Sequence, residues 1–223
     1  YIESNSFSHL DKLKILKLDR NNLTFLNQKI FENTILLEYL DISQNRLLEI
    51  PSHIFSKLSN LKELILSLNL INSIKDNSFY GLISLKELYL INNKINSINA
   101  NSFNNLKNLE LLLLDSNQIE FLDNYIFNLG NLKELSLAHN KINLIGPNFF
   151  VNLKNLKKLD LCDNFLRKIE QKSFSGLFNL EELRLSYNKI SKIEPDSFIQ
   201  LHKLSSLILY QNELVNMDAS ILK

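Results

Sequence analysis

Three residues in the second half of the chain could together support nucleophilic chemistry: Cys162, His139 and Asp163. A thiol beside an imidazole that a carboxylate orients is the arrangement used by cysteine nucleophiles. With Asp115 added, the same residues offer sulfur, nitrogen and oxygen ligands to a metal, although their spacing matches no standard site. Whether these side chains meet, and in what surroundings, depends on the elements that carry them.

Those elements follow a repeat of about 24 residues. Its signature is L-x-x-L-x-L-x-x-N-x-[L/I], which first appears at Leu13, Leu16, Leu18, Asn21 and Leu23. The asparagine recurs every 24 residues, except for one spacing of 23, at Asn21, Asn45, Asn69, Asn93, Asn117, Asn140, Asn164, Asn188 and Asn212. In L-x-L the leucines share one face of a strand and the intervening residues share the other. The repeat therefore predicts nine short parallel strands.

The rest of each unit repeats as well. An aliphatic residue usually falls five positions after the asparagine, and a phenylalanine falls ten positions after it in the first eight units. Among the apolar positions of the full units only Thr34 is polar, and the fifth unit lacks one residue after Phe127. One unit cannot bury its own apolar face, so we expect neighbouring units to stack around a common core.

This pattern resembles the typical 24-residue class of the leucine-rich repeat family, which carries a phenylalanine in the return segment. The resemblance covers essentially the whole chain. It implies a leucine-rich repeat solenoid, an α/β horseshoe with a right-handed superhelix, whose concave face is a parallel sheet of about nine short strands. We expect one domain over 1–223, with a partial repeat at 1–12, eight full repeats over 13–203 and a partial repeat over 204–223. We expect the terminal caps to lie outside this segment.

The recurrent asparagine falls where the chain leaves each strand. Its short amide can pair with backbone groups that a turn leaves unsatisfied. We therefore expect the asparagine ladder to be structural rather than a binding site.

The residues between the leucines point to the concave face, and they vary from unit to unit while the framework does not. Variable side chains on a rigid scaffold suit an adaptable binding surface. Units three to five place apolar side chains together within an acidic rim, which we call the concave patch: Ile65, Leu68, Tyr89, Ile91, Leu111 and Leu113, with Glu63, Glu87, Asp115 and Glu134. Such patches often mark interaction sites, although strand propensity alone also tolerates these residues. A smaller second patch contains Arg184, Tyr187, Ile208 and Tyr210.

A nucleophilic site on this face would also need oxyanion donors and exclusion of water. An open sheet face provides neither in an evident way, so we expect no catalytic residue, cofactor or metal, and we interpret Cys162, His139 and Asp163 as polar surface residues. The formal net charge of +1 argues against nucleic-acid binding and against membrane contact by this segment. A single cysteine permits no disulfide within the segment.

The sequence therefore predicts a non-catalytic module that binds a protein ligand on its concave face. The repeats resemble those of Toll-type receptors, Slit-like guidance proteins and secreted matrix proteins. That resemblance implies an extracellular or cell-surface receptor, adhesion or matrix protein, for which Asn22 in the sequon Asn22-Leu23-Thr24 is a glycosylation candidate. Two alternatives stay open: an intracellular scaffold or adaptor, favoured by the lone thiol of Cys162, and a purely structural matrix protein.

Overall fold

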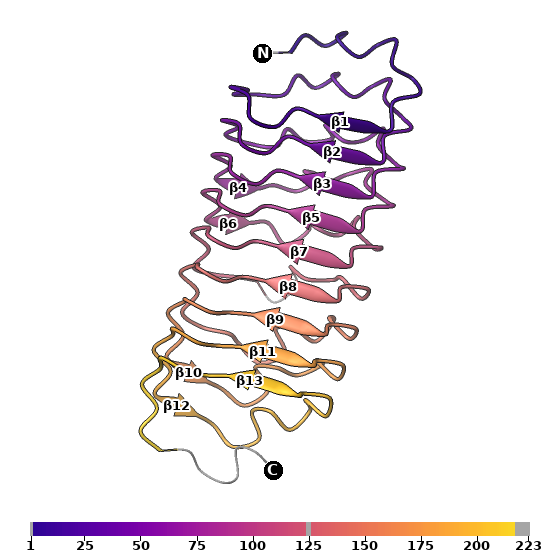
Figure 1. Cartoon of the computed structure of the whole chain (residues 1–223). Helices are drawn as coiled ribbons and strands as arrows, with labels where there is room; N and C mark the ends of the chain where they lie inside the picture. Colours follow the sequence, from indigo (N-terminus) through magenta and orange to yellow (C-terminus); the bar gives the residue numbers. More distant parts are fainter. Residues whose placement is uncertain (1, 124–125, 217–223) are drawn as a thin grey trace.

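A computed structural model describes residues 2–123 and 126–216. The chain winds through successive turns of a solenoid, each contributing one strand to a sheet that runs the length of the molecule (Figure 1). The strands of this sheet are β1 (Ile15–Lys17), β2 (Tyr39–Asp41), β3 (Glu63–Ile65), β5 (Glu87–Tyr89), β7 (Leu111–Leu113), β8 (Glu134–Ser136), β9 (Lys158–Asp160), β11 (Glu182–Arg184) and β13 (Ser206–Ile208). The nine-stranded parallel sheet and the solenoid predicted from the repeat are thus confirmed.

The register of the sheet follows the repeat. Each leucine at the centre of a strand pairs with the leucine at the centre of the next, as in Leu64 with Leu88 and Leu88 with Leu112. The missing residue of the fifth unit leaves this register intact, since Leu112 still pairs with Leu135. The shortening is therefore absorbed in the return segment and not in the sheet.

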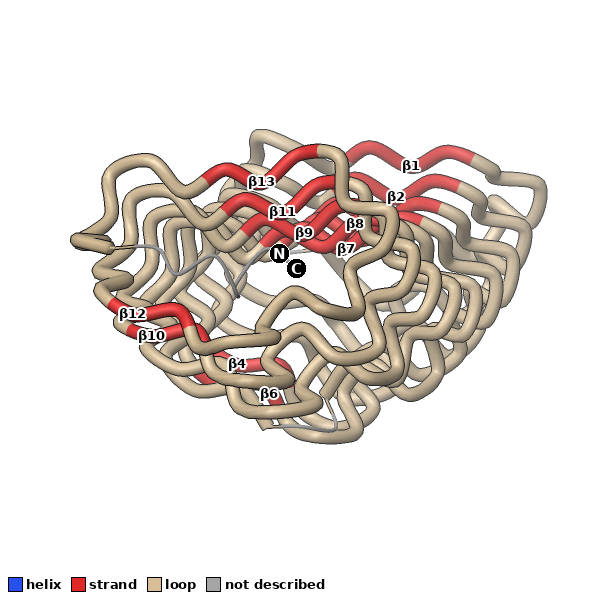
Figure 2. Tube along the Cα trace, turned by 90° about the horizontal axis from the view of Figure 1, so that it is seen from below, coloured by secondary structure: helices blue, strands red, loops and turns tan. Residues whose placement is uncertain are grey.

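The opposite side of the solenoid contains turns and two small parallel sheets. One joins β4 (Ser73–Ile74) to β6 (Ser97–Ile98), and the other joins β10 (Lys168–Ile169) to β12 (Lys192–Ile193). Seen along the solenoid, these short strands lie across the body from the long sheet, and the middle strands of the long sheet lie deeper than β1 and β13 (Figure 2). The sheet is therefore curved, with its open face on the concave side. Over the described residues the return segments contain no helix.

The core lies between the long sheet and the return segments. Central leucines such as Leu64, Leu88 and Leu112 are fully buried, and each contributes roughly 1.5–3 kcal/mol relative to exposure. Phenylalanines fill the return side, where the Phe79 and Phe103 rings stack at 5.8 Å between centroids. Thr34, the polar exception, is also buried and donates its hydroxyl to the carbonyl of Phe31 at 3.3 Å.

The packing of the phenylalanine rings changes at the fifth unit, which lacks one residue after Phe127. Phe127 meets Phe149 edge to face at 5.8 Å, and Phe149 meets Phe150 in the same way at 4.7 Å. Phe150 then returns to a parallel stack on Phe174. The additional ring of Phe149 thus bridges the position at which the one-residue deletion disturbs the column.

Candidate functional site

The buried asparagine ladder fixes the ends of the strands from which the candidate surface is built. The side-chain nitrogen of Asn117 donates to the carbonyls of Leu114 in its own unit and Leu90 in the preceding unit, both at 3.0 Å. Its Oδ1 accepts the backbone N–H of Ile95 at 3.0 Å. The same pattern recurs at Asn45, Asn69, Asn93, Asn140, Asn164 and Asn188. The structural role predicted for these residues is confirmed. Asn21 is exposed and bonds only to its own unit.

The residue before each ladder asparagine adopts a left-handed backbone. Its φ lies between 51° and 58° throughout the column, which runs Arg20, Gln44, Leu68, Asn92, Ser116, His139, Asp163, Tyr187 and Gln211. This conformation turns the chain out of the sheet and leaves the side chain at the edge of the concave face. Leu68 and Tyr187, which are unusual residues for such a backbone, are 48% and 54% exposed.

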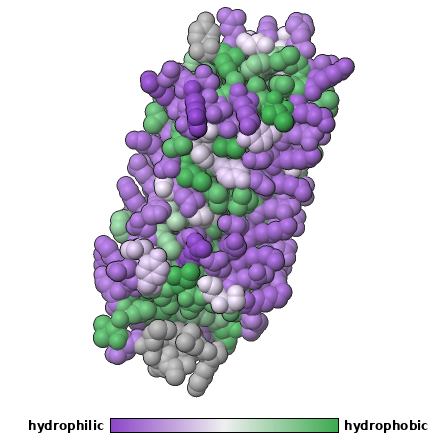
Figure 3. Space-filling view, in the orientation of Figure 1, coloured by the Kyte–Doolittle hydropathy of each residue, from purple (hydrophilic) through white to green (hydrophobic). Residues whose placement is uncertain are grey.

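The strands bring the concave patch together. In-register pairing puts Glu63, Glu87 and Leu111 side by side in one row, and Ile65, Tyr89 and Leu113 side by side in the next. All six are partly exposed. A band of apolar residues runs over the face of the sheet between hydrophilic margins (Figure 3). The patch is therefore contiguous across three strands.

The acidic side chains of the patch lie close together. Glu63 and Glu87 are register partners, and the Tyr89 hydroxyl donates to Oε2 of Glu87 at 2.5 Å. Partial burial, followed by the charges of Glu87 and Asp41, raises the pKa of Glu63. Burial is also the main cause of the raised pKa of Tyr89. A cation placed here would relieve this repulsion, because like charges directly opposite in a sheet are unfavourable.

Asp115 lies beyond β7 at the far edge of the patch. It accepts a hydrogen bond from the Ser136 hydroxyl. Burial raises its pKa, although that hydrogen bond opposes the shift. Glu134 lies next to Leu111 in register, so it closes the row that begins at Glu63. The acidic rim therefore reaches from β3 to β8.

The residues of the second patch also lie together, but the guanidinium of Arg184 already contacts acidic side chains. Arg184 and Ile208 are register partners, and the rings of Tyr187 and Tyr210 meet edge to face at 5.2 Å. The Arg184 guanidinium donates from Nε to Glu182 at 2.5 Å, and its Nη1 lies 3.6 Å from Asp160.

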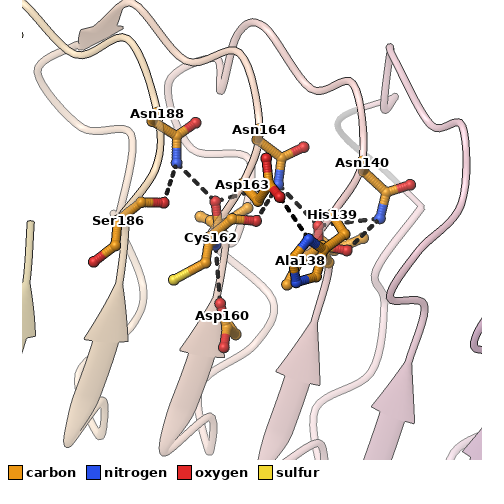
Figure 4. Close-up of polar contacts among 11 residues, drawn as sticks. Ala138, His139, Asn140, Asp160, Cys162, Asp163, Asn164, Ser186 and Asn188 are labelled. Atoms are coloured by element: carbon orange, nitrogen blue, oxygen red, sulfur yellow. Dashed lines mark hydrogen bonds and ion pairs between the residues drawn. The ribbon is translucent and has the colours of Figure 1, made fainter. Parts of the chain in front are cut away.

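The possible nucleophile does not form a reactive pair. His139 Nδ1 lies 2.6 Å from Asp163 Oδ2, but the sulfur of Cys162 points away from the imidazole, towards the neighbouring strand (Figure 4). Burial, followed by the charge of Asp160, raises the pKa of the Cys162 thiol to about 11. The thiol is therefore protonated near neutral pH, whereas a nucleophile needs a thiolate.

Two further candidates from the sequence are the possible metal ligands and the glycosylation site. Within residues 2–123 and 126–216, no three histidine, cysteine, aspartate or glutamate side chains converge in a way that could hold a metal ion. Asn22 is exposed in the turn that follows β1.

A charged column that the sequence analysis did not identify lies beside the concave face. It consists of the residue after the first leucine of each unit, on the flank where the chain enters the strands. Its members are Lys14, Glu38, Lys62, Lys86, Glu110, Lys133, Lys157 and Glu181. The regular spacing of about 24 residues is the signal that could have identified it. We call this surface the lateral flank.

The sequence matches a known family along most of its length. The family described as Leucine rich repeat matches residues 2–47, 35–95, 59–119, 108–161 and 154–214. No curated protein matches the sequence.

Solved structures with the same architecture are numerous. A leucine-rich repeat protein of Leptospira interrogans is 30% identical with a TM-score of 0.86, over 97% of this chain and 53% of that one. A chain of the complex of TLR13 with the RNA ssRNA13 is 30% identical with a TM-score of 0.80, over 100% of this chain and 35% of that one. A chain of the Drosophila Toll–Spatzle complex shares the fold, with 24% identity and a TM-score of 0.90 over 99% of this chain and 32% of that one.

These similarities extend over only part of the matched proteins. The chain spans about a third to a half of the length of each of these structures. In the described part of the chain no helix is long and apolar enough to cross a membrane.

Proposed function

Because the chain belongs to the leucine-rich repeat family, we propose that it is a non-catalytic recognition module that binds a protein ligand through the concave patch. The leucine-rich repeat is typically a non-catalytic interaction fold whose domains bind protein ligands. Within this fold, we place the binding site on the concave patch. This placement is carried by one observation, the contiguous apolar and acidic surface on β3, β5 and β7.

The chemistry of the patch specifies the partner. Ile65, Leu111 and Leu113 offer apolar contact area, and Tyr89 adds an aromatic ring with a polar end of the kind enriched at binding hot spots. A cation between Glu63 and Glu87 would relieve the repulsion between these register partners. The partner therefore presents an apolar side chain next to a lysine or arginine. Because the strands are held by the buried asparagine ladder, little ordering entropy is lost on binding.

The setting that we propose is extracellular, in a receptor, adhesion or matrix protein. The likeness to a TLR13 chain at 30% identity supports a receptor, and the exposed sequon at Asn22 is compatible with secretion. The alternative is an intracellular scaffold, for which the free thiol of Cys162 is the supporting observation. Peptide mapping of protein purified from its natural source separates these settings. A glycan on Asn22 supports the extracellular one, and an unmodified Asn22 favours the scaffold.

Selection of peptides from a displayed library on the immobilised protein tests the patch directly. We expect the enriched peptides to combine basic and apolar residues. The double variant Tyr89→Ala, Leu113→Glu should abolish their binding, because it removes the aromatic contact and adds a charge to the apolar centre. The matched control is Tyr80→Ala, Leu144→Glu, which makes the same chemical changes at exposed positions away from the sheet face. Equal binding by both double variants, with folding verified by circular dichroism, rules out the concave patch as the site.

A further inference from the structure

The lateral flank carries a repeating arrangement of charge. Glu38 lies between two lysines, 2.9 Å from Nζ of Lys14 and 2.5 Å from Nζ of Lys62. Glu110 lies in the same way between Lys86 and Lys133, at 3.5 and 2.5 Å. These contacts lower the pKa of Glu38 to about 2, with the hydrogen bond from Lys62 as the main cause. The flank is thus organised in lysine–glutamate–lysine triplets, each spanning three units.

Two lysines follow one another in the column wherever one triplet ends and the next begins. Lys62 and Lys86 occupy adjacent units, joined by a backbone hydrogen bond of 2.8 Å from the N–H of Lys86 to the carbonyl of Lys62. Lys133 and Lys157 repeat this arrangement, also at 2.8 Å. In both cases the column places no carboxylate between the two ammonium groups. Each of the four ammonium groups contacts a glutamate on its other side, with Lys157 3.0 Å from Glu181, so a junction is a place where an anion can compete for two adjacent lysines.

Both junctions open into one groove of about 710 Å³. Four lysines and the single carboxylate of Glu110 line it, which gives the lining a formal charge of +3. The rest of the lining is Ser84 and the amides of asparagines such as Asn108 and Asn155. Hydrophilic side chains are stacked along this edge of the molecule, on the right of the view in Figure 3. The groove is therefore polar, with a pair of lysines on each side of Glu110.

We propose that this groove binds a linear sulfated polysaccharide. Sulfate groups would occupy the two lysine junctions, and sugar hydroxyls would bond to the asparagine amides and Ser84 between them. The junctions are three units apart, so the sulfates that they hold would be about 14 Å apart, given about 4.8 Å between adjacent strands. This ligand and this surface are separate from the protein ligand of the concave patch.

The composition of the groove favours a polysaccharide over single-stranded nucleic acid. Proteins that hold single strands stack the bases on aromatic side chains, and the described lining of the groove has none. The concave face cannot substitute for the groove, because Glu63, Glu87 and Glu134 would repel a polyanion.

The glutamates of the triplets do not block such a ligand. All four groove lysines are more than half exposed in their ion pairs, and exposed pairs of this kind stabilise by only about 0–1 kcal/mol. A polymer that supplies several sulfates at once can therefore displace them. Glu110 is the only carboxylate in the described lining, and Glu38 and Glu181 contact Lys62 and Lys157 from beside it, so these three glutamates oppose binding.

Affinity for a size-defined, fully sulfated heparin oligosaccharide, measured by calorimetry in low and high salt, tests the proposal. The variant K62Q/K86Q/K133Q/K157Q should lose at least about tenfold in affinity and much of the salt dependence, because fewer counterions are released. The control K29Q/K57Q/K94Q/K141Q removes the same charge from exposed lysines elsewhere and should stay within about twofold of the parent. The single variant E110Q should bind more tightly, and it keeps the test decisive if the quadruple variant folds poorly.

Three results would overturn the proposal. The first is an equal loss of heparin affinity in the groove variant and the control, which would show that binding depends only on net charge. The second is unchanged or weaker heparin binding by E110Q. The third is a single-stranded RNA of matched charge that binds the parent as tightly as heparin with the same lysine dependence, which would reassign the groove to nucleic acid. Loss of heparin binding by the groove variant with full retention by the control and by Tyr89→Ala, Leu113→Glu supports it.

Discussion

Two asparagine ladders run along this solenoid with the same period but in different surroundings. The inner ladder, represented by Asn117, is buried, and its amide joins four backbone groups in two units. The outer ladder, on the lateral flank, is largely exposed, and each amide makes a single bond to the preceding unit, as from Asn108 to the Ile83 carbonyl at 2.8 Å. The outer members are Asn60, Asn108, Asn131, Asn155 and Asn179.

The difference shows that residue type and spacing alone do not set the energetic role of a ladder. A polar group that is buried costs about 1–3 kcal/mol when its partner is removed, whereas water replaces a lost partner at the surface. The inner ladder therefore holds the fold together, and the outer ladder is free to vary or to bind.

The largest expected effect separates the two ladders at positions close together in the chain. Asn117→Ala should lower the free energy of unfolding by about 1–3 kcal/mol, because it leaves the buried N–H of Ile95 unpaired. The carbonyls of Leu90 and Leu114 retain a second donor from Asn93 and Asn140 respectively. Urea unfolding followed by circular dichroism measures the change.

The matched variant is Asn108→Ala, nine residues earlier and exposed. It should change the unfolding free energy by less than about 0.5 kcal/mol. Equal losses at the two positions would contradict the conclusion that burial distinguishes the ladders.

Two buried serines extend the same comparison to hydroxyl groups. Ser102 donates to the carbonyl of Ile74 at 3.0 Å, whereas the buried Oγ of Ser186 has no hydrogen-bond partner among the described residues. Ser102→Ala should therefore destabilise by about 1 kcal/mol, and Ser186→Ala should be neutral or stabilising. Thermal unfolding of both variants checks this, and a marked loss in Ser186→Ala would show that its hydroxyl is paired.

The left-handed column gives a smaller effect. Leu68 has a φ of 58°, and asparagine tolerates this backbone better than leucine does. Leu68→Asn should stabilise by about 0.5–1 kcal/mol, and the reverse change Asn92→Leu at the equivalent position should destabilise by a similar amount. Opposite shifts in the urea midpoint are the expected result, and shifts in the same direction would argue against backbone strain.

The smallest effects distinguish the concave patch from the lateral flank. We expect the stability effects of substitutions on these two surfaces to depend on pH with opposite sign. The pKa of Asp115 is raised in the folded protein, so its ionised form opposes folding at neutral pH, and this penalty disappears as pH falls through the raised value. Asp115→Asn should therefore be more stable than the parent at pH 7, with an advantage that shrinks towards pH 4. Melting temperatures across this range measure the difference.

Glu38 on the lateral flank should behave in the opposite way. Its pKa is lowered to about 2, so it contributes stability above about 4.5, which is lost as pH falls towards 2. Glu38→Gln should be slightly less stable than the parent at pH 7, with the deficit disappearing in acid. If the stability difference between either variant and the parent does not change with pH, the effect does not come from titration of the replaced carboxylate.

The repeat made the framework predictable. Alternating aliphatic residues in each strand segment and an asparagine at a fixed distance allow only one register, because a slip of one residue would expose the aliphatic side chains. The pairing of Leu64 with Leu88 and the role of Asn117 therefore followed from spacing alone. The bridging position of the Phe149 ring did not follow from spacing, because this ring compensates for a residue missing elsewhere in the chain.

The candidate surfaces were predictable only in part. The rows that contain Glu63 and Tyr89 could be read from the strand pattern, as could the proximity of His139 to Asp163. The direction of the Cys162 sulfur, the pairing of Arg184 with Glu182 and the lysine junctions of the flank could not. Each depends on which of several nearby partners a flexible side chain contacts.

The sequence by itself thus determined the solenoid, its register and which residues face outwards, because these follow from apolar periodicity and from the need to pair buried backbone groups. Only the tertiary structure decided which outward residues act together. Lys62 and Lys86 are 24 residues apart in the chain, and stacking places them side by side. Long side chains at a surface choose partners by geometry and local charge, and these arise only when the turns are stacked.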